Sequence, residues 1–152
     1  MPATPLTEIY QTICIKMREQ MDIGIIKWYD IDLGQTEPDS FDFPVDYPAV
    51  FVKFDDVIWR DKDDTVQVGT LTVSFKIIFQ FQKEEEFINL APDGRGEVLD
   101  FLNNLELLHQ AIITISGGTF NKLRRFNQYQ GNSNPKDLRW VQVLQYQCNV
   151  YS

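Results

Sequence analysis

Residues 71–81 read LTVSFKIIFQF, and this stretch sets the architecture of the chain. Apolar side chains occupy every second position, at Leu71, Val73, Phe75, Ile77, Phe79 and Phe81. Because successive side chains of a strand point to opposite faces, the alternation predicts a β-strand with one buried face. Burial of the six side chains contributes roughly 9–18 kcal/mol gross, so a one-residue slip of the strand would lose most of that energy.

The preceding residues predict the partner of this strand. Residues 49–59 are apolar enough for a strand, residues 60–64 form a polar turn, and residues 65–82 form the returning strand of a β-hairpin. The apolar phase changes at Gly69 and Thr70, where we expect a β-bulge or a sharp bend. At ~3.3 Å per residue the returning strand would reach nearly 60 Å, against about 40 Å for a compact domain of this size. The hairpin tip should therefore bend or project.

Further out, the N-terminal part predicts a helix followed by a strand. Apolar residues recur at steps of three and four over residues 5–21, with Thr4 as N-cap and Pro5 at the first helical position. Residues 23–32 are rich in β-branched and aromatic side chains, which favours a strand.

The C-terminal part repeats this order. Val98 to Ile112 form a second amphipathic helix that Gly117 and Gly118 should end. Two strands, residues 120–129 and 138–151, then surround a turn at residues 131–135.

The predicted fold is a single α+β domain over residues 1–152. Its order is α-β-β-β-α-β-β, with one mixed or antiparallel sheet of about five strands, two helices packed on one face and a long central β-hairpin.

Residues 33–48 form a long acidic loop in which prolines alternate with aspartates and aromatic residues. Two interpretations stay open. The loop is a strap whose aromatic side chains hold it to the core, or its segment from Phe41 to Tyr47 binds another protein.

Charge and composition exclude several classes of function. The net charge is -8, which disfavours sequence-independent binding to nucleic acid or to an anionic membrane. No apolar run approaches the ~18 residues of a membrane span, and residues 4–8 do not resemble a signal peptide. We expect a protein that is cytosolic or borne by a virion.

No residue pattern predicts catalytic, cofactor-binding or metal-binding residues. The only histidine, His109, falls on a helical apolar stripe, and Cys14 and Cys148 are expected to be buried, reduced thiols. The carboxylate pairs Asp30 with Asp32 and Asp55 with Asp56 leave a small carboxylate-dependent enzyme as an alternative, which a deep pocket lined by two of them would support. We expect no enzyme.

Two charged clusters are candidates for a subunit interface. Lys122, Arg124 and Arg125, with Lys136 and Arg139 on the partner strand, form a basic cluster in an acidic chain. It is either a solvated face or a surface that meets an acidic patch of a neighbouring copy, such as Asp61, Asp63 and Asp64 or residues 84–86. Different patches that meet head to tail generate closed rings.

The order of elements, the hairpin FVKFDDVIW then LTVSFKIIFQF, and the closing LRWVQVLQYQCNVY resemble the tail terminator, or tail-completion, proteins of long-tailed bacteriophages and prophages. The resemblance covers most of the chain and lies in arrangement and length. It implies a structural protein of the virion, assembled in the cytoplasm of the bacterial host. It also implies a ring of copies, typically a hexamer, that caps the tail tube and joins the head-connector or neck protein.

Overall fold

The computed structural model describes residues 4–35, 45–81, 97–132 and 139–151. The elements within these ranges are α1 (Pro5–Asp22), β1 (Trp28–Ile31), β2 (Ala49–Asp61), β3 (Gln67–Gln80), α3 (Glu97–Ile112), β4 (Arg124–Gln130) and β5 (Arg139–Tyr151). This order of helices and strands is the one that the sequence predicts.

The five strands form one mixed sheet in the order β1-β2-β3-β5-β4. Only β1 and β2 are parallel, whereas the β2–β3, β3–β5 and β4–β5 pairs are antiparallel. The central hairpin and the C-terminal hairpin are thus both confirmed.

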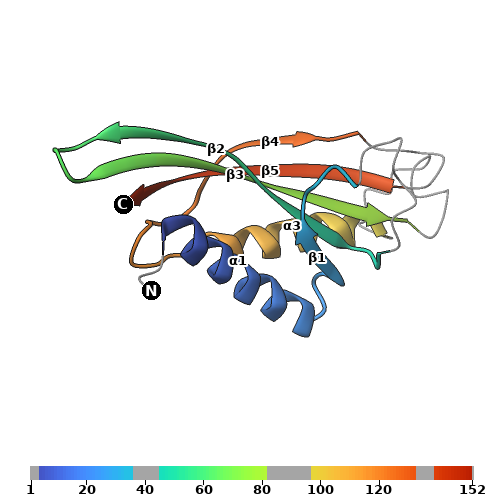
Figure 1. Ribbon diagram of the computed structural model, residues 1–152. Coiled ribbons are helices and arrows are strands. Elements are labelled where there is room, and N and C mark those ends of the chain that lie inside the picture. The colour runs from blue at the N-terminus through green and yellow to red at the C-terminus, as the bar shows by residue number, and fades with distance from the viewer. Residues whose placement is uncertain (1–3, 36–44, 82–96, 133–138, 152) are drawn as a thin grey trace.

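Both helices cover the same face of the sheet (Figure 1). The main core joins α1 through Ile9, Ile13 and Met17 to the alternating apolar residues of β3 and β5. From α3 it receives Phe101, Leu105, Leu108 and Ile112. The alternating apolar side chains predicted for residues 71–81 therefore point toward the helices. We call the sheet face that bears the helices the helix face.

The opposite face, here called the outer face, holds a second and smaller apolar cluster at one end. Its buried members are Ala49, Phe51, Ile78, Val141 and Val143. Trp28, Val45 and Tyr47 pack against it. Tyr47 thereby supports the strap interpretation of the acidic loop at its C-terminal end, while Phe41 and Phe43 lie outside the described residues.

Helix α1 begins as predicted and is followed by a shorter strand than predicted. The Thr4 hydroxyl accepts a hydrogen bond from the Thr7 backbone N–H at 3.2 Å, with Pro5 in the first turn. Strand β1 begins only at Trp28, because Ile23 is the C-cap of α1 and Gly24 turns the chain with a φ of 85°. The expectation that residues 23–27 are β-structure is wrong.

The β-bulge expected at Gly69 is also wrong. The pairing of β3 with both neighbours is continuous through Gly69, and the bulge lies in β2, between Phe54 and Asp56. A Cβ atom at Gly69 would lie 2.9 Å from side-chain atoms of Val57 and Trp59, so the glycine makes room for its cross-strand neighbour Trp59. The change in the apolar alternation at Gly69 therefore reflects close packing of the glycine against Trp59. It does not reflect an extra residue in β3.

The prediction that Gly117 and Gly118 end the second helix is also wrong. Helix α3 ends at Ile112, and the Thr114 hydroxyl donates a hydrogen bond to the Ala111 carbonyl at 2.6 Å. Gly117 lies against the Glu8 carboxylate, which accepts hydrogen bonds from the N–H and hydroxyl of Thr119 at 2.9 and 3.1 Å. The glycine therefore permits a contact between the first turn of α1 and the loop after α3.

The central hairpin projects, as its length predicts. The β3–β5 pairing ends at Val68 opposite Tyr151, so residues 62–67 extend beyond β5. Figure 1 shows this tip reaching past the C-terminus and past the helices.

Candidate assembly interface

The tip of the central hairpin carries three exposed carboxylates, those of Asp61, Asp63 and Asp64. Asp63 builds the turn, since its Oδ1 accepts hydrogen bonds from the N–H of Thr65 at 2.8 Å and of Val66 at 2.9 Å. These hydrogen bonds, that from the Thr65 backbone first, lower the pKa of Asp63 below its ordinary value. The Asp63 carboxylate therefore stays charged at neutral pH. We call residues 61–64 the acidic tip.

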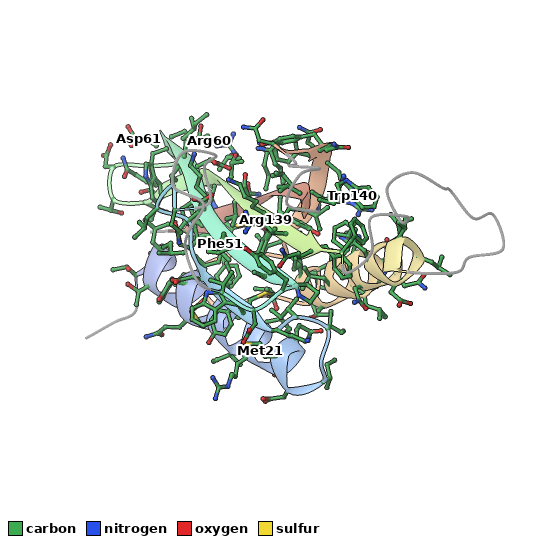
Figure 2. The ribbon with its side chains drawn as sticks, turned by 90° about the vertical axis from the view of Figure 1, so that its right-hand side faces the viewer. Met21, Phe51, Arg60, Asp61, Arg139 and Trp140 are labelled. Carbon is green, nitrogen blue, oxygen red and sulfur yellow. The ribbon has the colours of Figure 1, made fainter. Side chains whose placement is uncertain are left out.

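The acidic tip stands apart from the rest of the molecule. Asp61 accepts a hydrogen bond from the Gln67 side chain at 2.9 Å, within the same hairpin. Figure 2 shows Asp61 and Arg60 on the side of the view opposite Trp140. The carboxylates are thus placed to reach a neighbouring molecule.

The predicted basic residues Lys122, Arg124 and Arg125 come together in a groove of about 400 Å³. The groove lies where β4 begins, and no carboxylate is among the residues that line it, which also include Thr70 and Gln147. All three cations are exposed. This basic groove is a positive site on a chain of net charge -8.

Arg139 does not belong to the basic groove, which corrects the predicted cluster. Arg124 lies opposite Gln147 of β5, eight residues along the strand from Arg139, a distance of roughly 26 Å at ~3.3 Å per residue. The Arg139 guanidinium instead lies over the Tyr47 ring, 5.7 Å from its centroid. Lys136 lies outside the described residues.

Within one molecule, the acidic tip and the basic groove remain separate. The ion pairs among the described residues join Lys16 to Glu19, Lys53 to Asp55 and Lys76 to Asp32. None of these three pairs links the tip to the groove. Among the described residues, the two charged surfaces therefore do not neutralise each other.

A chain of hydrogen bonds crosses four strands of the outer face. The Asn127 amide donates to Gln145 at 2.8 Å, Gln145 donates to the Ser74 hydroxyl at 3.2 Å, and Ser74 donates to the carboxylate of Asp55. Asp55 is the residue that the β2 bulge adds. The bulge thus supplies the acceptor that ends the chain, a feature that sequence reasoning missed because it placed the bulge in β3.

Two of the predicted carboxylates, Asp32 and Asp55, line one groove of about 350 Å³ on the outer face. Lys76 lies 3.5 Å from Asp32, and Lys53 lies 4.0 Å from Asp55. Each carboxylate is therefore paired with a cation, as in a network that holds strands in register. Asp30 is used locally, since it accepts a hydrogen bond from the Ile31 N–H at 2.8 Å.

His109 has a partner in the core, as expected for a helical histidine. Its Nδ1 lies 2.8 Å from the Tyr146 hydroxyl, and the two rings stack at 5.8 Å. Burial, followed by the positive charge of Arg125, lowers the pKa of His109. The neutral imidazole therefore links α3 to β5.

The remaining candidates for chemistry are unremarkable within the described residues. Cys14 and Cys148 are free thiols. Cys148 is buried as expected, and burial raises its pKa to about 12, whereas Cys14 is only half-buried, contrary to the expectation. The described residues hold no group of three or more histidine, cysteine, aspartate or glutamate side chains that could bind a metal ion. No helix in the described ranges has the length and apolarity needed to cross a membrane.

The comparisons with known proteins find similarity to solved structures. No family model matches the chain, and no curated protein sequence matches it. Among solved structures, the fold is similar to that of a chain in the virion of a native gene transfer agent particle, with a TM-score of 0.53 and 12% identity. The match covers 95% of this chain and 92% of that chain. The two chains therefore share a fold over nearly their whole lengths.

Proposed function

We propose that this protein is a structural component of a phage-like virion that assembles as a ring, caps the tail tube and joins it to the head connector. The observation that carries the proposal is the pair of open sheet edges next to a projecting hairpin with an acidic tip. Among the described strands, β4 and most of β2 each pair on one side only. Such surfaces favour association with other chains.

The likeness to a chain of a gene transfer agent virion supports this proposal. That chain belongs to the virion of a native gene transfer agent particle, and the match covers 95% of this chain and 92% of that chain.

The contacts between copies are proposed to be electrostatic in part. The acidic tip, with Asp61, Asp63 and Asp64, meets the basic groove of the next copy, with Lys122, Arg124 and Arg125. Because the two surfaces differ, the contact is head to tail and closes into a ring when the rotation between copies permits. Arg139 is left out of this interface because it packs on Tyr47.

The net charge of -8 suits a ring whose channel lets DNA pass. A channel that makes few contacts to phosphate does not hold the DNA as it moves. The ring is thus expected to contact proteins, the tail-tube protein on one side and the neck protein on the other, and to show no specific binding to nucleic acid.

A capping assay with purified tail-tube subunits tests the function. Added in excess, the protein should stop tube elongation and be visible by electron microscopy as a ring at one tube end. Mass measurement in solution gives the oligomer that forms without the tube. Tubes that elongate normally and carry no added protein at either end would contradict the proposal.

A further inference from the structure

In the part of the chain that the structure describes, the sheet ends in two edges that have no further strand beside them and lie on opposite sides. Strand β4 pairs with β5 alone, and β2 pairs with β1 only as far as Val52. No other described strand covers β4 or residues 53–61 of β2. Both edges therefore offer backbone N–H and C=O groups to another strand.

The two edges run in opposite directions. Strand β2 is antiparallel to β3, β3 is antiparallel to β5, and β5 is antiparallel to β4. When copies repeat side by side in the same orientation, β4 of one copy therefore meets β2 of the next as an antiparallel pair. The topology allows one continuous sheet across the subunits.

Both edges expose large apolar side chains where the pairing would form. On β2, Ile58 is 67% exposed and Trp59 is 40% exposed. On β4, Phe126 is 52% exposed and Tyr129 is 46% exposed. Edge pairing would remove part of this apolar surface from water, which favours association.

We propose that β4 of one copy pairs antiparallel with β2 of the next, with Tyr129 opposite Ile58 and Arg125 opposite Asp61. This junction rests on the proposed function, since it is the contact between copies of the ring. It restricts the partner of the basic groove to a second copy of this chain.

The faces of the sheet limit the registers that are possible. Tyr129 lies opposite Val143 on the outer face, and Ile58 lies opposite Thr70 on the same face. In a continuous sheet, directly opposite side chains share a face, so Tyr129 can meet Ile58 or a residue two positions away. An aromatic residue opposite a β-branched residue is also a favourable cross-strand pair.

The charges select one of these registers. The β4 register shifts between Arg125 and Asn127, so one residue of the partner strand can lie opposite two of β4. With Tyr129 opposite Ile58, Arg125 then lies opposite Asp61, and the acidic tip reaches the basic groove. A slip of two residues toward Asp56 would place Arg125 opposite Trp59 and Arg124 opposite Arg60, which brings like charges together. A slip the other way would pair Tyr129 with Arg60 and run β4 past Asp61, where β2 ends.

Cysteine pairs test this register in the assembled protein. The double variant Ile58→Cys/Tyr129→Cys should give a ladder of covalent multimers with a short thiol cross-linker. The control Asp56→Cys/Tyr129→Cys, displaced by two residues on the same face, should give several-fold less product. Wild type and the single variants measure any reaction of Cys14, since Cys148 is buried.

A charge exchange tests the same junction without cysteines. Arg125→Glu should weaken assembly severalfold, and Arg125→Glu/Asp61→Lys should restore it, because every junction then regains an opposite pair. Assembled rings that cross-link both cysteine pairs equally, or neither, would overturn the junction and leave the capping function standing. A protein that stays monomeric and ignores tube ends would contradict both.

Discussion

Strands β3 and β4 belong to the same sheet and have opposite surroundings. Strand β3 has a neighbour on each side and buries its alternate residues, whereas β4 has one neighbour and exposes all seven of its side chains. Substitutions in β3 should therefore affect folding, and those in β4 should affect association. We therefore expect the central strand β3 to determine the stability of the fold and the edge strand β4 to take part in the proposed assembly.

The largest expected effect is on folding, from Phe75→Ala in β3. Phe75 is fully buried and contacts the Tyr146 ring edge to face at 5.5 Å. Its loss should lower the free energy of unfolding by about 3–5 kcal/mol. Urea denaturation measures the change, and Tyr129→Ala in β4, expected to cost less than about 0.5 kcal/mol, is the matched control.

A smaller effect, confined to association, is expected from Arg124→Glu/Arg125→Glu in β4. The variant should weaken assembly on the order of tenfold or more, since about 1.4 kcal/mol of lost interaction is tenfold in affinity. Its unfolding curve should match that of wild type. Analytical ultracentrifugation reads the assembly.

The control for this variant is Arg18→Glu/Lys27→Glu, which makes the same change of net charge at exposed positions outside the basic groove. If both variants weaken assembly equally, total charge and not the groove is responsible. Assembly unaffected by the Arg124 and Arg125 reversal would show that the groove is a solvated face.

The comparison also explains what the sequence could predict. Strand β3 was predicted from its alternation because burial on one face leaves a period of two in the residues. The edge position of β4 could not be predicted in this way, since it depends on which strands pair and not on local pattern. The charge pattern of the sequence predicts the basic residues of β4 as a cluster, but it does not predict the groove in which they lie.

The errors have local physical causes. Arg139 was grouped with Arg124 because both lie on paired strands, but long strands separate residues along their length. The β-branched residues after α1 favour a strand from residue 23, whereas Gly24 first turns the chain. The phase change at Gly69 predicts a bulge or bend, because sequence cannot distinguish an extra residue from a glycine packed beneath Trp59.

A further prediction concerns the hydrogen bonds that tie β4 to the centre of the sheet. Ser74 is buried, donates to Asp55 and accepts from Gln145. Ser74→Ala should lower the free energy of unfolding by about 1 kcal/mol, because the groups it leaves are only partly exposed to water. Asn127→Ala, at the exposed end of the chain, should cost less in the same thermal or urea measurement.

The smallest expected effect is the pH dependence contributed by His109. Its pKa is lowered in the folded protein, so on acidification the unfolded chain binds a proton before the folded protein does. The free energy of unfolding therefore decreases as the pH is lowered. The contribution is complete above the ordinary pKa of about 6.5 and is lost as pH falls through the folded pKa. Between pH 7 and pH 5, wild type should lose more stability than His109→Gln, which keeps an acceptor for Tyr146.

An equal loss in both proteins would show that other groups dominate over this range. In that case the His109–Tyr146 contact would be a packing contact alone, with no influence on how the link between α3 and β5 responds to acid.

Hydrogen–deuterium exchange on the protein alone and on assembled rings tests the role of the edges most directly. The amides of β4 and of residues 53–61 in β2 that point away from their paired strand should exchange quickly in the free protein and become protected in the ring, while β3 stays protected in both. Assembled rings in which the amides of both edges exchange as fast as in the free protein would contradict the account.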